Sequence, residues 1–205
     1  MDFLSQLALA GGLAWASGIR LYATIFIVGL LGRYGWLQLP EPLLALQHGW
    51  VLGAAALMGV GEFLADKVPG FDSVWDALHT FIRIPAGAFL AWGAMGDSTP
   101  AAQMAAALVG GLITSGTHLA KSSGRVAINT SPEPFTNWTT SLGEDGLVLG
   151  LLFLAIQHPL LLLLALVLFL LLLVWLLPRL MRFVARVWRL LHGRDTAVLP
   201  SPSTR

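Results

Sequence analysis

Long apolar segments alternate with short polar ones along almost the whole chain. About 20 apolar residues are enough to cross the hydrocarbon core of a bilayer, and six segments approach that length. They cover residues 7–31, 50–65, 81–95, 101–119, 142–156 and 159–177. The second, third and fifth segments are short for a full crossing. The pattern therefore predicts an all-α, polytopic membrane protein of about six transmembrane helices, with some broken or re-entrant segments.

The first segment, residues 7–31, is long for one straight crossing. Its middle carries small and polar side chains, including Ser17, Gly18 and Arg20. Helices bend or break where such residues interrupt an apolar run. We therefore expect a tilted or broken helix here.

Composition supports the membrane class. Hydrophobic residues make up 56% of the 205 residues and charged residues 11%, and the mean hydropathy is +0.75, well above the usual composition of a soluble domain. The chain has no cysteine, which excludes disulfides and thiolate metal sites. We expect the lipid bilayer and a small solute or ion as partners, and no nucleic acid. A homo-oligomer is also compatible with the sequence.

The basic residues predict an orientation, because Lys and Arg concentrate in short cytoplasmic loops. Six crossings with both termini in the cytoplasm place Lys67, Lys121 and Arg125 inside, with the C-terminal arginines. Arg83 then lies at the inner end of the third segment, and Arg33 alone faces outside.

Three regions follow from the pattern: a membrane domain over residues 1–178, a basic amphipathic helix over 179–193 and a disordered tail over 194–205. In the second region, arginines recur at helical spacing between apolar residues. Such a helix is typical of one that lies on anionic lipids, although a helix that docks a partner has the same pattern.

Weak internal similarity divides the membrane domain into repeats over residues 5–97 and 101–178. Gly11 and Gly12 align with Gly110 and Gly111, and Arg20 aligns with His118. Each repeat would hold three segments, so the second would enter the membrane from the opposite side. Inverted repeats of this kind are typical of transporters.

Ionisable residues inside apolar segments are the main candidates for function, because such groups are costly in hydrocarbon. Arg20 needs a carboxylate partner, and the acids that lie inside segments are its natural partners. We therefore predict a central polar cluster for the solute. Its members are Arg20, Glu62, His118, Glu144 and Asp145. A purely structural ion pair that holds helices together is the alternative.

A second group lies between the second and third segments. Asp72, Asp76 and His79 follow helical spacing, so they share one helix face, which Arg83 continues. Carboxylates with an imidazole could hold a divalent cation or pass a proton. With Asp66, these residues are predicted to form a cytoplasmic mouth. An interfacial helix with ion pairs in water is the alternative.

A polar segment follows the fourth apolar segment. We predict a gating loop that carries Lys121, Arg125, Asn129, Glu133 and Asn137. An ordinary connecting loop is the alternative, and the segment lacks the spacing of a phosphate-binding loop.

Four strings carry a family resemblance: SGIRLYATIFIVGLLGR, EFLADKVPGFDSVWDALHTFIRIPAGA, INTSPEPFTNW and SLGEDGLVLG. They resemble the bacterial and plant membrane-protein family called domain of unknown function 4126, over about residues 5–178. The resemblance implies a membrane protein and names no activity, substrate or cofactor. The arginine-rich, lysine-poor composition is typical of a bacterium with GC-rich DNA, so we expect the bacterial inner membrane.

Three classes of function are compatible with the sequence. We favour a small transporter or channel. Because acids outnumber the nearby bases, we weakly prefer a cation as the solute, with possible proton coupling. A membrane-embedded, metal-dependent lipid enzyme is the second class, since Asp72 and Asp76 resemble a metal-binding carboxylate pair. The third class is a non-catalytic scaffold. Of these, an enzyme is not the favoured class.

Overall fold

The computed structural model describes residues 1–68, 71–129 and 134–192, and this part of the chain is helical with no strand. Its elements are α1 (Phe3–Ile19), α2 (Leu21–Arg33), the short 3-10 helix η1 (Glu41–Gln47), α3 (Gly49–Ala65), α4 (Phe71–Ala94), α5 (Pro100–Asn129), α6 (Pro134–Gln157) and α7 (Pro159–His192). The predicted all-α class is confirmed.

Proline and a capping aspartate set where several helices begin. Helices α5, α6 and α7 begin at Pro100, Pro134 and Pro159, because proline suits the first helical position, where its missing N–H is not needed. At the start of α1, the Asp2 carboxylate accepts a hydrogen bond of 3.0 Å from the Ser5 backbone N–H, a typical N-cap.

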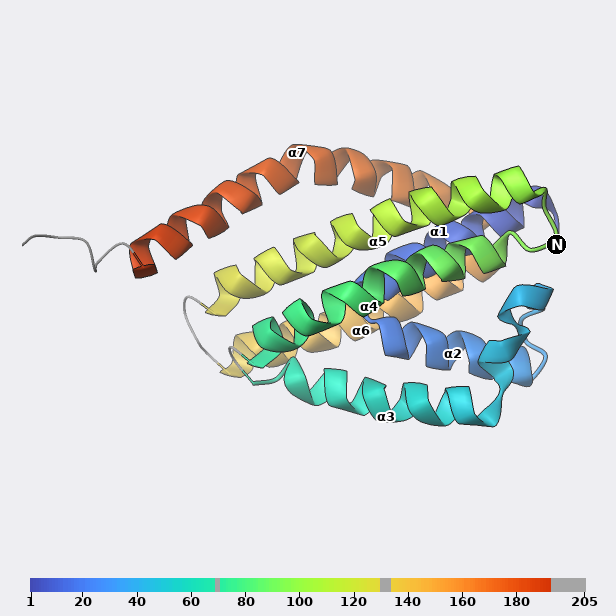
Figure 1. Cartoon of the computed structure of the whole chain (residues 1–205), viewed down its shortest axis with the longest axis horizontal. Helices are drawn as coiled ribbons and strands as arrows, with labels where there is room; N and C mark the ends of the chain where they lie inside the picture. The colour runs from blue at the N-terminus through green and yellow to red at the C-terminus, as the bar shows by residue number, and fades with distance from the viewer. Residues whose placement is uncertain (69–70, 130–133, 193–205) are drawn as a thin grey trace, which may run out of the picture.

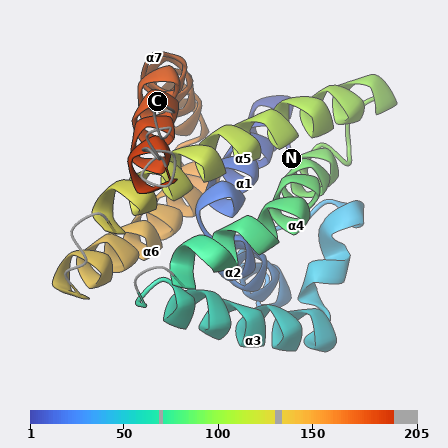
Figure 2. The same ribbon diagram turned by 60° about the vertical axis from the view of Figure 1, so that its left-hand side comes forward.

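Helix α1 is the centre of the molecule, surrounded by α4, α5, α6 and α7 (Figure 2). Every residue from Ala8 to Ile19 is buried, as expected for a helix that is apolar all round. Its small side chains bring neighbours close, since a Cβ on Gly12 would lie 2.8 Å from the Cβ of Ala155 on α6. Trp15 stacks on Phe169 of α7 with ring centroids 4.4 Å apart.

The first apolar segment breaks at Arg20 and doubles back (Figure 1). Helix α1 runs antiparallel to α6, from Gly12 beside Ala155 to Arg20 beside Ser141. Helix α2 then runs back on the side of α6, since Leu31 of α2 and Ile156 of α6 line the same cavity. The predicted break is confirmed, and the two helices on either side of it form a hairpin. We call α1 and α2 together the re-entrant hairpin, with Arg20 at its apex.

Both ends of the re-entrant hairpin lie at the same end of the bundle. The Met1 ammonium is 3.9 Å from Asp97, between α4 and α5. After α2, Pro42 packs against Gly96 in the same connection. Helix α7 ends at the opposite end of the bundle (Figure 1). The prediction that both termini lie in the cytoplasm stays a prediction.

Two described helices are long and apolar enough to cross a membrane, and they cover residues Phe135–Gln157 and Pro159–Phe183. Helices η1 and α3 would form a third crossing as one unit, bent by 67°. This is compatible with a membrane protein, but six crossings are not confirmed. Helices α4 and α5 carry buried charged residues, among them Asp72, Asp76 and Arg83 on α4 and Arg125 on α5, which lower the apolar character of each helix.

The inverted three-helix repeat is not confirmed either. The chain breaks at Arg20, whereas α5 continues unbroken past its aligned counterpart His118. The predicted basic helix is the C-terminal half of α7 rather than a separate element, with Arg179 and Arg182 exposed. The predicted disordered tail, residues 194–205, lies outside the described residues.

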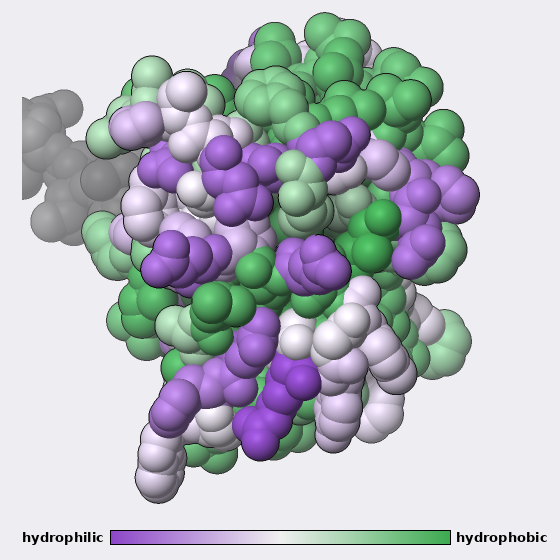
Figure 3. Space-filling model, turned by 90° about the vertical axis from the view of Figure 1, so that its right-hand side faces the viewer, coloured by the Kyte–Doolittle hydropathy of each residue, from purple (hydrophilic) through white to green (hydrophobic). Residues whose placement is uncertain are grey.

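The end of the bundle that holds the N-terminus is polar. Figure 3 looks at this end and shows hydrophilic side chains across it, with hydrophobic side chains along the flanks. Large aromatic residues are exposed nearby, with Tyr34, Trp36 and Trp50 at 66%, 76% and 84%. Aromatic residues of this kind favour the boundary between hydrocarbon and water.

Candidate functional site

Arg20 adopts an extended backbone conformation between two helices, with φ −143° and ψ 92°. Its N–H donates to the Ala16 carbonyl at 2.9 Å, and its own carbonyl accepts from the Thr24 N–H at 3.1 Å. The break leaves the last carbonyls of α1 without partners in their own helix. Basic side chains from other helices replace those partners.

These basic side chains are Arg83 on α4 and Lys121 on α5. Arg83 Nη1 donates to the carbonyls of Gly18 and Ile19 at 3.3 and 3.2 Å, and Lys121 Nζ donates to the Ile19 carbonyl at 3.1 Å. Positive charge is favourable at the C-terminal end of a helix. Tertiary contacts therefore maintain the apex of the re-entrant hairpin.

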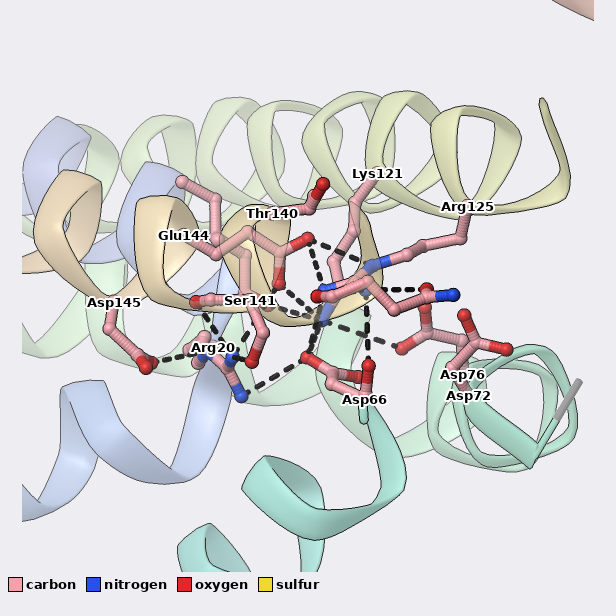
Figure 4. A network of polar contacts seen from close by, with 12 residues as sticks. Arg20, Asp66, Asp72, Asp76, Lys121, Arg125, Thr140, Ser141, Glu144 and Asp145 are labelled. Atoms are coloured by element: carbon pink, nitrogen blue, oxygen red, sulfur yellow. Dashed lines mark hydrogen bonds and ion pairs between the residues drawn. The ribbon is translucent and has the colours of Figure 1, made fainter. Parts of the chain in front are cut away.

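The Arg20 side chain is buried and meets partners from two elements (Figure 4). Its guanidinium lies 2.6 Å from Asp145 and 3.1 Å from Asp66, and 3.7 Å from Glu144. Nη2 also donates to the Ser141 hydroxyl at 2.7 Å. The predicted pairing of Arg20 with Glu144 and Asp145 is therefore present.

Asp66, which caps the C-terminus of α3, holds three cations at once. Its carboxylate lies 3.1 Å from Arg20, 3.1 Å from Lys121 and 3.5 Å from Arg125. The side chain is fully buried. A buried carboxylate needs such compensation, because leaving water is costly for any charge.

Glu62 pairs with Arg83 rather than with Arg20, at 2.6 Å. Arg83 Nη1 also donates to His118 Nδ1 at 3.3 Å. Because a guanidinium can only donate, His118 Nδ1 is the acceptor, and the ring proton of the neutral imidazole is on Nε2. That nitrogen lies 2.8 Å from the Thr80 hydroxyl.

Arg125 extends the cluster towards the ends of α5 and α6. It lies 2.9 Å from Glu144 and donates to the Asn137 side chain at 3.3 Å. Asn129 donates to both carboxylate oxygens of Asp72, at 2.9 and 3.2 Å. Four residues of the predicted gating loop, Lys121, Arg125, Asn129 and Asn137, lie on helices α5 and α6, and Glu133 lies outside the described residues.

The three predicted groups thus form one charge network instead of a centre, a mouth and a gate. Its members are Arg20, Glu62, Asp66, Asp72, Asp76, Arg83, His118, Lys121, Arg125, Asn129, Asn137, Ser141, Glu144 and Asp145. Ser141 and the carbonyls of Gly18 and Ile19 were missed. Ser141 precedes Asp145 by one helical turn, which is the signal in the sequence.

His79 does not join the two aspartates that share its helix face. Its Nδ1 lies 2.8 Å from the Trp75 carbonyl, and the ring stacks on Trp75 at 4.1 Å. Among the described residues, no three His, Asp or Glu side chains form a group that could hold a metal ion. The arrangement therefore does not provide the predicted divalent-cation site.

A cavity of about 410 Å³ opens beside the apex of the re-entrant hairpin, between α2, α3 and α6. Its walls are mainly apolar, with Phe26, Ala56 and Val148 among them, and Arg20 and Asp145 contribute its charged groups. The Asp145 side chain keeps 32% exposure. The charge network is thus open on one side and buried elsewhere.

The sequence model of the family described as Domain of unknown function (DUF4126) matches residues 7–179. No curated protein and no solved structure matches the chain.

Proposed function

The chain belongs to the DUF4126 family, whose description assigns no activity, and we propose from its charge network that it is a small membrane transporter or channel for a cation. One observation carries the proposal: two half-helices, α1 and α2, meet at a charged break inside a helical bundle. In transporters, discontinuous helices often use their freed carbonyls to bind cations. Here these carbonyls face Arg83 and Lys121.

The charges of the network favour a cation as solute. Its carboxylates are Glu62, Asp66, Asp72, Asp76, Glu144 and Asp145, and the cations in contact with it are Arg20, Lys67, Arg83, Lys121 and Arg125. The carboxylates outnumber the cations. An arriving anion would have to displace carboxylates from several guanidiniums, whereas a cation would meet surplus negative charge.

We place the end of the bundle with Lys67, Arg179 and Arg182 on the cytoplasmic side, because basic residues concentrate there. The N-terminus and Arg33 then lie on the outer side. The re-entrant hairpin then enters from outside, and the charge network extends from its apex to Asp72 and Asn129, near the cytoplasmic ends of α4 and α5.

A metal-dependent lipid enzyme has less support. Asp72 is held by Asn129, and His79 turns to Trp75, so the supposed catalytic group does not converge.

Flux through liposomes that contain the purified protein tests the proposal. We expect the protein to carry at least one of sodium, potassium, ammonium or protons, and Glu144→Gln to reduce that flux at least tenfold. This change keeps the side-chain shape but removes a carboxylate that faces Lys121, Arg125 and Arg20.

Glu41→Gln is the matched control, since Glu41 is exposed on η1 at the other end of the bundle. Size-exclusion chromatography establishes that both variants are folded. Wild-type liposomes that carry none of the four cations would contradict the proposal, and so would unchanged flux in folded Glu144→Gln.

A further inference from the structure

Four oxygen atoms surround the ammonium group of Lys121. They are the Ile19 carbonyl at 3.1 Å, Asp66 Oδ2 at 3.1 Å, Glu144 Oε2 at 3.4 Å and Asp76 Oδ1 at 3.9 Å. They come from α1, the C-cap of α3, α6 and α4. The Lys121 side chain is only 4% exposed. We call these four oxygens the ammonium cage.

The ammonium cage is spaced for N–H donors. Hydrogen bonds from nitrogen to oxygen are typically 2.7–3.2 Å long, whereas oxygen ligands lie about 2.0–2.6 Å from magnesium or calcium. The two nearest oxygens fit the first range. The described acidic residues also form no metal-binding group. The four oxygens are thus already arranged around one nitrogen cation, the Lys121 ammonium group.

Asp76 Oδ1 is the cage oxygen farthest from the Lys121 ammonium group, beyond hydrogen-bond distance. Asp76 is 1% exposed, yet neither of its carboxylate oxygens accepts a hydrogen bond from the described residues. Its nearest cations are Arg83 at 3.6 Å and Lys121 at 3.9 Å. A lysine ammonium has three N–H donors, but a free ammonium ion has four. The fourth N–H group could donate a hydrogen bond to the Asp76 carboxylate.

The ammonium cage can persist when Lys121 leaves, because each carboxylate also has a guanidinium partner. Asp66 lies 3.1 Å from Arg20 and Glu144 lies 2.9 Å from Arg125, and Arg83 is the partner of Asp76. Replacing the lysine ammonium by one monovalent cation also leaves the charge of the site unchanged. A monovalent cation could therefore replace the Lys121 ammonium group without leaving the carboxylates unpaired and without changing the charge of the site.

We propose that the ammonium cage binds the ammonium group of the transported solute, either the ammonium ion or a small primary ammonium cation. Lys121 is the tethered occupant that the solute displaces. This inference rests on the proposed function, and it names the class of solute.

Chemical rescue tests the proposal. The full-length Lys121→Ala variant, purified in detergent, is heated in ammonium, methylammonium, sodium or choline chloride at equal ionic strength. We expect a lower unfolding midpoint than in the wild type, restored by ammonium and methylammonium and rising with the logarithm of their concentration. Sodium, which lacks N–H donors, and quaternary choline should not restore it.

Lys67→Ala is the matched control, since the Lys67 ammonium lies over the Phe63 ring and donates to the Ser141 hydroxyl, and none of its contacts is a cage oxygen. Ammonium should not restore its midpoint. No rescue of Lys121→Ala would overturn the proposal, and equal rescue by sodium would overturn the assignment to ammonium. If Lys121→Ala does not fold, Lys121→Gln replaces it, and ammonium should then stabilise this variant more than it stabilises the wild type. An equal response in the two proteins would overturn the proposal.

Flux separates this inference from the proposed function. Rescue by ammonium without any cation flux in wild-type liposomes would support the ammonium cage and contradict transport. Flux of another cation without rescue would support transport and overturn the cage.

Discussion

Arg83 and Glu62 form a fully buried ion pair, with Nη2 and Oε1 2.6 Å apart. Isolated charges in such a position are very costly, so each residue depends on the other. The sequence indicated that buried arginines need acids, and it correctly joined Arg20 to Glu144 and Asp145. It assigned Glu62 to Arg20 as well, because residue spacing does not show which face of α3 meets α4.

Loss of the Glu62 charge should therefore be severe. We expect Glu62→Gln to lower the free energy of unfolding by about 3–5 kcal/mol, because Arg83 would keep its charge without its closest carboxylate. Chemical unfolding in detergent measures the change, and exposed Glu41→Gln is the control. A loss below about 1 kcal/mol, the usual value of a surface pair, would show that the pair is not important for stability.

At the scale of elements, glycines set how closely α4 and α5 approach. A Cβ on Gly87 would lie 2.7 Å from the Thr114 Cβ, and a Cβ on Gly110 would lie 2.3 Å from the Ala91 Cβ. This close packing places Arg83 and Thr80 beside His118. Helical periodicity identified the polar face of α4, but a glycine in an apolar run does not reveal what it touches.

Adjacent glycines on α5 offer a matched comparison. We expect Gly110→Ala to destabilise the protein by about 1–3 kcal/mol, the usual cost of overpacking, since neither helix backbone can move away without disturbing the charge network. Gly111→Ala should be tolerated, because its Cβ would lie 3.5 Å from the Ala88 Cβ, an ordinary contact. Thermal unfolding of both variants measures the difference, and equal midpoints would contradict close packing at Gly110.

At the scale of the whole molecule, the re-entrant hairpin brings both ends of the first apolar segment to the same end of the bundle. Apolar length predicted the helices correctly, two of them are long and apolar enough to cross a membrane, and small residues with Arg20 indicated a break. The direction of the chain after the break depends on contacts far away in sequence, such as that between Arg20 and Ser141. Hydropathy along the chain contains no information about those contacts.

Labelling of single cysteines tests the hairpin, and the chain has no native cysteine that would interfere. We expect Phe3→Cys and Trp36→Cys to react with an impermeant reagent from one side of the membrane, and Val68→Cys from the other. All three positions are exposed, at 60%, 76% and 54%. Labelling of positions 3 and 36 from opposite sides would mean that the first segment crosses completely.

The re-entrant hairpin also constrains how the protein is made. It leaves the ribosome first, yet Ser141, a partner of Arg20, follows 121 residues later, and Asp145 later still. Asp66, the nearest partner in sequence, also follows only 46 residues after Arg20, and an arginine without partners in hydrocarbon costs about 2.5–3.5 kcal/mol even on the insertion scale. We therefore expect the nascent hairpin to stay outside the hydrocarbon at first. It would pack into the bundle last, after the later helices have been inserted.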